Sequence, residues 1–367
     1  MTARTQYAPR FGVEEEFLLL DQATGLPRDG ADELVRALPD LRCDYEYFHS
    51  QIETATPVCT AANEALESLT TFRTRAAAAA AQHGLVLAGT GLPPVGGSQP
   101  GRVVANDRYL NIDRTMRGMV TRYYSTGTHV HVEVPSRDAG VDVFARIAAW
   151  SPVLVALTAN SPVWLSGDTG YASWRYMSVQ QWPSSGYPPH FASANEYEQV
   201  VQSLVRAGAL IDPALVNWSI RLSDKYPTIE LRTADSQLEA RDAVAFALIL
   251  RALVARALRE RDAAEPFERA QADVLRGAHW LAARNGIATE LVHPHVGEAR
   301  PAFEVISALL DYVSGELDDA GDLATVERFL ARRRATLGPA ELQRATWAAG
   351  GTQALLELYR AGHTATA

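Results

Sequence analysis

The pattern of hydrophobic and polar positions predicts interspersed strands and helices in the first two-thirds of the chain, and mainly helices after that. Short runs that alternate between apolar and polar residues are typical of strands. The best of these runs lie at residues 11–21, 51–56, 85–90, 128–135, 216–222 and 228–234. Apolar residues at helical spacing predict helices instead. Those segments lie at residues 61–83, 141–158, 241–262, 268–284, 302–317, 323–336 and 340–360.

The order of these elements favours an α+β fold. Helices do not follow the strands at the regular intervals of a doubly wound parallel sheet. An antiparallel sheet with helices packed against one face fits the order better. Neither an internal repeat nor a long linker divides the chain, so we expect residues 1–367 to form one domain, mostly helical from about residue 241 to 367. Residues 174–191 are expected to form a long ordered loop, in which Trp182 and Tyr187 belong either to a site or to surface packing.

Four of the predicted strands have one apolar face and one face that carries ionisable groups. Side chains alternate between the two faces of a strand, so every second residue shares a face. The polar faces carry Glu14 and Glu16, then Glu53, then His129, His131 and Glu133, and finally Glu230 and Arg232. In the first of these strands Val13, Glu15 and Phe17 point the opposite way.

These polar faces could converge on a metal or phosphate site. Several carboxylates a few ångströms apart raise one another's pKa and cost stability unless cations lie between them. Mg²⁺ suits such a place, because it is held by carboxylates together with substrate phosphates. The alternative is that these residues form the solvent side of a half-exposed antiparallel sheet, which needs no function. Glutamate is depleted in strands, however, so the run Glu14-Glu15-Glu16 favours a site.

Composition narrows the class of protein. Hydrophobic residues make up 47% and charged residues 21%, which is typical of a globular domain. A net charge of −9 argues against a broad nucleic-acid surface. The longest apolar stretches, such as residues 243–250, are too short to cross a bilayer, and we expect no membrane association. The two cysteines, Cys43 and Cys59, form neither a disulfide framework nor a zinc pattern, and they fit a cytoplasmic location.

Five segments together carry a resemblance to a known family. They are residues 11–17 (FGVEEEF), 51–57 (QIETATP), 127–132 (GTHVHV), 174–189 and 226–232 (YPTIELR), in family order over most of the chain. With them the sequence resembles the glutamate–cysteine ligase type 2 family, the carboxylate–amine ligases. The resemblance implies a glutamine-synthetase-like catalytic fold, with an antiparallel sheet cupped around the active site and helices on the outer face. It also implies that ATP phosphorylates a carboxylate, with that of L-glutamate expected, and that an amine such as L-cysteine attacks the acyl phosphate.

The resemblance also assigns roles to residues of this sequence. The implied ligands of Mg²⁺ are Glu14, Glu16, Glu53 and Glu230. His129 and Arg232 are the implied catalytic and ATP-binding contacts, since Mg²⁺ prefers oxygen and His129 then suits a phosphate better than a metal. Arg175 is expected to grip a substrate carboxylate, which a guanidinium can bind with two hydrogen bonds.

Several questions stay open on the sequence alone. His131 or a carboxylate could accept the proton of the amine, and the residues do not choose between them. A small-molecule kinase of the same fold and a non-catalytic metabolite-binding descendant are the alternative functions. No residue identifies the carboxylate or the amine, and a homodimer is the default assembly for an enzyme of this size. Replacing Glu53 or Glu230 with Gln is expected to abolish turnover without unfolding the chain.

Overall fold

An antiparallel sheet forms the centre of the molecule in the computed structural model, which describes residues 8–97 and 99–364. Its strands run in the order β2-β3-β1-β5-β9-β8, and β4 also pairs with β1. Their bounds are β1 (Phe11–Asp21), β2 (Asp44–Tyr45), β3 (Gln51–Ala55), β4 (Leu85–Ala88), β5 (Gly127–Glu133), β8 (Ile220–Leu222) and β9 (Thr228–Asp235). Every pairing in this sheet is antiparallel, as the sequence predicts.

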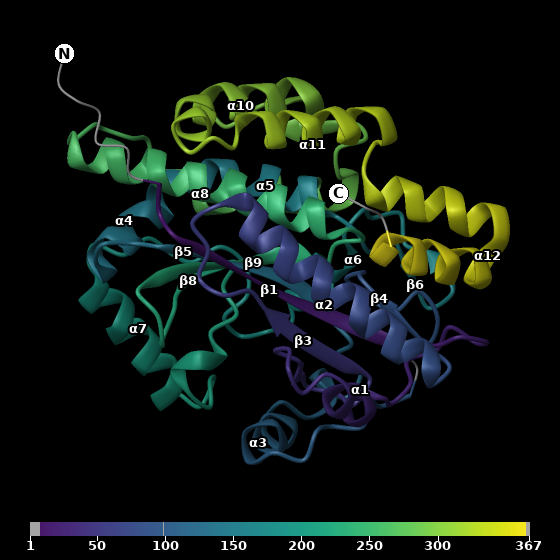
Figure 1. Cartoon of the computed structure of the whole chain (residues 1–367). Helices are drawn as coiled ribbons and strands as arrows, with labels where there is room; N and C mark the ends of the chain where they lie inside the picture. The colour runs from purple at the N-terminus through teal and green to yellow at the C-terminus, as the bar shows by residue number, and fades with distance from the viewer. Residues whose placement is uncertain (1–7, 98, 365–367) are drawn as a thin grey trace.

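The helices are α1 (Ala31–Ala37), α2 (Ala62–Gln82), α3 (Asp107–Met116), α4 (Arg137–Ile147), α5 (Ser151–Thr158), α6 (Trp174–Val179), α7 (Ala194–Arg206), α8 (Ala240–Asp262), α9 (Ala272–Asn285), α10 (Ala302–Asp319), α11 (Leu323–Thr336) and α12 (Pro339–Thr364). Several of these helices, α2, α4, α5 and α8 among them, pack against one face of this sheet, whereas α3 lies beside the cavity described below (Figure 1). Two small hairpins complete the fold: β6 (Val163–Trp164) with β7 (Gly167–Asp168), and β10 (Glu290–Val292) with β11 (Ala299–Pro301). The architecture is α+β, as predicted.

Helix α8 forms the middle layer between the sheet and the outer helices. It contacts β1 and β5 on one side and α10 and α11 on the other (Figure 1). A helix buried on both sides needs apolar residues all round, and the run from Ala243 to Leu250 is fully buried. The apolar face of the sheet packs against this layer with Val13, Val130 and Val132, which are likewise buried.

Glu15 is a charged residue on this apolar face. Its carboxylate accepts two hydrogen bonds from Arg73 of α2, at 2.8 Å from Nε and 2.5 Å from Nη2, and both side chains are buried. Arg73 also donates to the backbone carbonyls of Gln237 and Leu238. A buried charge is tolerated only when it is paired and fully hydrogen-bonded, and this pair meets that condition.

Three of the predicted elements differ from the structure. The predicted helix at residues 141–158 begins earlier, at Arg137, and is broken by a 3₁₀ turn at Ala148–Trp150. Pro152 explains the break, since it lacks an N–H and its ring would clash with the carbonyl four residues before it.

The other two differences concern the predicted strand at residues 216–222 and the predicted loop at residues 174–191. Only Ile220–Leu222 of that strand pairs, because the chain makes a 3₁₀ turn at Pro213–Leu215 before it. The loop begins with helix α6, whose first N–H groups are capped by the hydroxyl of Ser173. Trp182 lines the cavity described below, whereas the hydroxyl of Tyr187 donates to the Phe144 carbonyl.

One stretch has the length and apolar composition of a membrane span, residues Arg137–Thr158. It corresponds to α4 and α5 with the turn between them, and 78% of its most apolar part is buried inside the fold. Core helices of globular proteins often have the same length and apolar composition. The packing of α4 and α5 inside the fold accounts for their composition.

We expect the protein to lose stability as the pH falls from about 6.5 to 4, partly through His279 of α9. Its ring lies between those of Tyr176 and Tyr187, with Nε2 2.9 Å from the Ser151 hydroxyl and Nδ1 2.8 Å from the Leu275 carbonyl. Burial lowers the pKa of His279 to about 4, so the unfolded chain takes up the proton first. The stability that the neutral ring contributes above pH 6.5 is therefore lost across this window, by about 2 kcal/mol between pH 7 and pH 5.

Urea unfolding at a series of pH values measures this loss. The variant His279→Gln, which does not titrate, should lose less stability over the same window. An identical pH dependence in the two proteins would contradict the assignment.

Candidate active site

The opposite face of the sheet carries the ionisable residues singled out in the sequence. The antiparallel register places Glu14 beside His129, Glu16 beside Glu53, and His131 beside Glu230. All of them line one cavity of about 480 Å³, a size typical of a small-molecule site. Arg232 and Arg175 line the same cavity. Glu133 lies on the same strand face but outside the cavity, where it pairs with Arg10.

The two histidines lie between carboxylates. His129 is buried, with Nε2 3.5 Å from Glu16 and Nδ1 3.7 Å from Glu14. His131 has Nε2 3.7 Å from Glu14 and 3.9 Å from Glu230, and its Nδ1 lies 2.9 Å from the Thr228 hydroxyl. Among the described residues Nε2 of His131 is buried without a hydrogen-bond partner. That nitrogen is therefore available to a proton, a ligand or a cation.

Two groups of side chains could each hold a cation. Glu14, His131 and Glu230 form one group, and Glu16, Glu46 and Glu53 form the other, with the ligand atoms of each group within 4.8 Å of one another. The second group is all carboxylate, which suits Mg²⁺, and the first mixes oxygen with an imidazole. The geometry thus gives a cation contact to His131, whereas the sequence placed His129 near the phosphates and left His131 as a possible base.

Glu46 is a site residue that the sequence analysis missed. It follows the two-residue strand β2, in a stretch with no hydrophobic periodicity. Only the strand register of the structure accounts for its place: Asp44 pairs with Glu53 and Tyr45 pairs with Ile52. Continuing that register by one residue would place Glu46 opposite Gln51, which shares a strand face with Glu53.

The electrostatics of the all-carboxylate group favour a bound cation. Burial, together with the negative charges of Glu16 and Glu14, raises the pKa of Glu53 to about 8. The pKa of Glu46 is also raised well above its ordinary value, by burial and by Glu16 and Glu53. The three carboxylates therefore cannot all ionise near neutral pH on their own, and a divalent cation would remove the conflict.

Two arginines favour the ionised form of Glu230, in contrast to Glu53. Arg221 donates to it at 2.7 Å from Nε and 3.0 Å from Nη2, and Nη1 of Arg232 forms a further ion pair. Burial would raise the pKa of Glu230, but Arg232 and Arg221 outweigh it and hold the pKa below its usual range. Arg232 also reaches Nδ1 of His129 at 3.5 Å. Arg221 was missed in the sequence, although it lies on the polar face of the strand predicted at residues 216–222.

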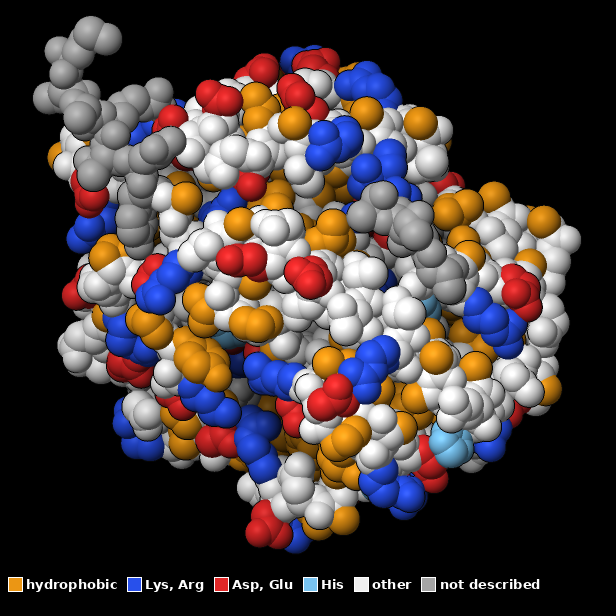
Figure 2. Space-filling view, in the orientation of Figure 1, with side chains coloured by type: hydrophobic (Ala, Val, Ile, Leu, Met, Phe, Trp, Pro, Cys, Tyr) orange, Lys and Arg blue, Asp and Glu red, His pale blue; other side chains and the backbone are white. Residues whose placement is uncertain are grey.

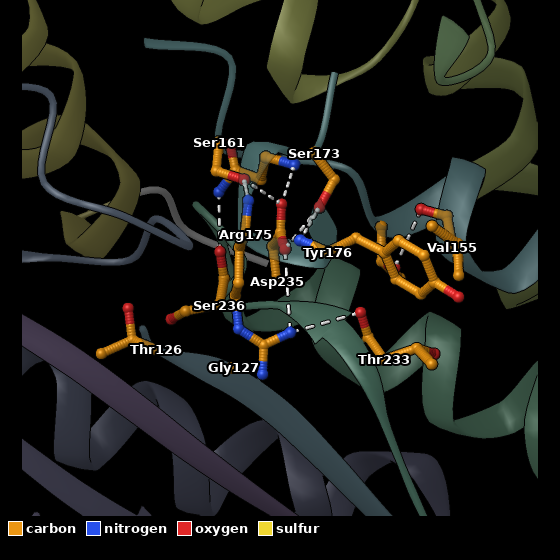
Figure 3. Close-up of polar contacts among 12 residues, drawn as sticks. Thr126, Gly127, Val155, Ser161, Ser173, Arg175, Tyr176, Thr233, Asp235 and Ser236 are labelled. Atoms are coloured by element: carbon orange, nitrogen blue, oxygen red, sulfur yellow. Dashed lines mark hydrogen bonds and ion pairs between the residues drawn. The ribbon is translucent and has the colours of Figure 1, made fainter. Parts of the chain in front are cut away.

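Arg175 lies in the first turn of α6 and is buried against the cavity wall. Its guanidinium makes only long contacts: 3.4 Å to the Thr233 carbonyl, 3.4 Å to the Arg232 carbonyl and 3.8 Å to Asp235 (Figure 3). Its Nε has no hydrogen-bond partner among the described residues. A buried guanidinium with unused donors is suited to an anionic ligand.

Basic side chains also line the cavity, next to the glutamates of the sheet that form its acidic floor. Arg42, Arg108 and Lys225 all line it. Arg108 of α3 also pairs with Asp212, at 3.0 Å, beside the 3₁₀ turn that forms another part of the wall. On the face drawn in Figure 2, Lys and Arg side chains are mixed with Asp and Glu, without a broad basic area. Positive charge around an acidic floor suits a phosphate-bearing ligand that arrives with cations.

Two solved structures share this architecture. The fold is similar to that of a glutamate–cysteine ligase from Francisella tularensis in complex with AMP, with a TM-score of 0.72 and 13% identity. The alignment covers 97% of this chain and 88% of that chain. A bifunctional glutathione synthetase from Pasteurella multocida gives a TM-score of 0.69 at 15% identity, with 97% of this chain and 52% of that chain covered. These likenesses confirm the predicted fold.

Relatives found by sequence are more similar to this chain than these two solved structures are. A protein of Rhodococcus jostii named "Putative glutamate--cysteine ligase 2-1" is 38% identical over 344 residues, covering 94% of this chain and 93% of its own. A "Putative glutamate--cysteine ligase 2-2" of a Mycobacterium species is 39% identical over 346 residues, which cover 92% of this chain and 94% of the relative. The pattern of glutamate–cysteine ligase family 2 matches residues 10–342. The chain belongs to glutamate–cysteine ligase family 2.

Proposed function

We propose that this protein is an ATP- and Mg²⁺-dependent ligase that joins the γ-carboxyl of L-glutamate to an amine, with L-cysteine as the first candidate. The observation that carries the proposal is the convergence of Glu14, Glu16, Glu53 and Glu230 in one cavity beside Arg232 and Arg175. Family membership supports ligase chemistry, and the names of the relatives support this pair of substrates.

The cavity provides what phosphoryl transfer asks of a protein, namely positioning and neutralisation of charge. Bound Mg²⁺ would neutralise the phosphates of ATP, and the carboxylates of the two groups, above all Glu16, Glu46 and Glu53, would hold it. Arg232 and His129, which line the cavity side by side, are the proposed contacts of the transferred phosphoryl group, and Glu230 pairs with the guanidinium. Arg175 provides donors for a substrate carboxylate.

The reaction has two balanced steps. A carboxylate oxygen of the first substrate attacks the γ-phosphorus of ATP, the bond to the β-phosphate oxygen breaks, and ADP leaves. The amine nitrogen then attacks the carbonyl carbon of the acyl phosphate, inorganic phosphate leaves, and the nitrogen loses a proton. Nε2 of His131, which has no hydrogen-bond partner among the described residues, is one candidate acceptor for that proton, and a carboxylate of the floor is the alternative.

The test is ADP release by the purified protein with Mg²⁺-ATP and L-glutamate, with and without L-cysteine, while products are followed by mass. We expect ADP release that depends on cysteine and a new mass for γ-glutamylcysteine. A glutamate-dependent ADP release with another amine would keep the ligase and change the amine. A stable phosphorylated product would instead indicate a small-molecule kinase, and no ADP across a broad panel would favour a non-catalytic binding protein.

Two further expectations from the sequence stay predictions: that the protein is a homodimer and that it works in the cytoplasm.

A further inference from the structure

Asp235, at the end of β9, is a buried carboxylate that does not line the cavity. It accepts four contacts from the segment that leads into α6. Oδ2 accepts hydrogen bonds from the backbone N–H of Asn160 and from the Ser161 hydroxyl, both at 2.7 Å. Oδ1 accepts one from the Ser173 hydroxyl at 2.9 Å and lies 3.8 Å from Nη1 of Arg175 (Figure 3).

The same two serines hold the start of α6. The Ser161 hydroxyl oxygen accepts the N–H of Arg175 at 3.0 Å, and the Ser173 hydroxyl oxygen accepts the N–H of Tyr176 at 3.1 Å. Each hydroxyl thus donates to Asp235 and accepts from the first turn of the helix. Because the carboxyl oxygens of Asp235 accept from both hydroxyls and so orient them, the direction of the first turn depends on Asp235.

The contacts leave the guanidinium of Arg175 incompletely neutralised. The strong hydrogen bonds of Asp235 go to Asn160 and the serines, so the carboxylate faces Arg175 only at 3.8 Å. If Asp235 accepted two hydrogen bonds directly from Arg175, it would occupy the donors that a substrate carboxylate needs. At this distance Asp235 balances the buried positive charge while Nε of Arg175 keeps its donor.

Two glycines show how closely this arrangement is packed. A Cβ added at Gly127 would lie 2.3 Å from Nη2 of Arg175, and one at Gly91 would lie 2.8 Å from the Asp235 carboxyl carbon. Such contacts are too short to be tolerated without movement. The guanidinium and the carboxylate therefore lie directly against backbone, which restricts them to one arrangement.

We propose that Asp235 is a positioning residue, which fixes the first turn of α6 so that Arg175 presents its free donors to a substrate carboxylate. The inference rests on the proposed function, because it takes Arg175 as the carboxylate anchor. The affinity for one amino-acid substrate then depends on Asp235, a residue outside the cavity.

The first test compares Asp235→Ala and Asp235→Asn with the wild type in steady-state kinetics. Asp235→Ala should raise the KM of one amino-acid substrate at least about tenfold, with kcat changed less than about threefold and the KM of ATP unchanged. Asp235→Asn keeps an acceptor for Asn160 and Ser161 and can donate to Ser173, so it should recover much of the lost affinity. Equal rises in the KM of ATP and of both amino acids, or no rise, would overturn the proposal.

Asp322→Ala is the matched control. Asp322 is also a buried carboxylate, paired with the buried Arg251, but neither residue lines the cavity. It should lower stability and leave all three KM values unchanged. If Asp322→Ala raises the same KM, the effect of Asp235→Ala is general destabilisation and the proposal fails.

A second test does not require activity. Hydrogen exchange followed by mass spectrometry should show faster exchange over residues 174–179 in Asp235→Ala and near wild-type exchange in Asp235→Asn. The control should leave that segment unchanged. Exchange that is unaltered in Asp235→Ala refutes the positioning role, even if the wild type proves inactive. A wild type without ligase activity refutes the proposed function instead, so the two failures are distinct.

Discussion

Glu53→Gln is expected to lower the rate of ADP release at least about 10³-fold, because the all-carboxylate group loses one of its ligands for the cation. Gln keeps the size of the side chain but cannot supply a negative oxygen. The measurement is ADP release with saturating Mg²⁺-ATP and the best substrate pair. Glu67→Gln, which changes an exposed glutamate of α2, is the matched control and should retain wild-type activity. Wild-type turnover by Glu53→Gln would refute the assignment of this group.

The same variant should be more stable than the wild type when no metal is present. The pKa of Glu53 is raised in the folded state, so its contribution to stability is complete below pH 4.5 and is lost as the pH rises towards about 8. Gln removes this loss, which such a shift of the pKa places at up to about 4 kcal/mol at pH 8. Thermal unfolding with EDTA and with Mg²⁺ checks the sign: the wild type should gain stability from Mg²⁺, and Glu53→Gln should gain less.

Glu230→Gln is expected to abolish turnover as well, but with the opposite effect on stability. The carboxylate of Glu230 neutralises Arg221 and Arg232, and removing its charge leaves both guanidiniums without their partner. Breaking a buried pair costs about 3–5 kcal/mol, which we reduce to about 2 kcal/mol because the arginine side chains are 17% and 22% exposed. The expectation of an undisturbed fold therefore applies to Glu53 better than to Glu230.

Urea unfolding at neutral pH without metal measures that difference. The two variants should move in opposite directions from the wild type, although both lose activity. Equal stability of Glu230→Gln and the wild type would show that the arginines do not depend on this carboxylate. Retained ADP release would remove Glu230 from the site.

The polar faces of the strands were predictable because strand side chains alternate strictly. Once Phe11–Asp21 and Gly127–Glu133 were recognised as strands, the shared face of Glu14 with Glu16 and of His129 with His131 followed. That the faces of four strands meet in one cavity did not follow from spacing, since strand order is set by long-range pairing. The resemblance to a family supplied that step.

Contacts made by loops and helix ends were not predictable. Glu46 reaches the site from a segment without periodicity, and the partner of Glu15 lies on α2, 58 residues away. The contacts of Asp235 depend on where residues 160–175 cross the end of β9. None of these has a local pattern, because the residues meet only through the tertiary fold.

The register of the sheet also bears on how the protein acquires its site during folding. Glu16 accepts a hydrogen bond from the N–H of Gly127, 111 residues further along, and His131 meets Glu230 only when β9 joins β5. Contacts this distant in sequence form slowly, since the entropy of closing large loops must be lost first. A nascent chain that has not yet reached β9 holds most of the acidic floor but lacks the strand that closes it. If the group that includes Glu230 holds a cation, as proposed, it can do so only late in folding, once the sheet is complete.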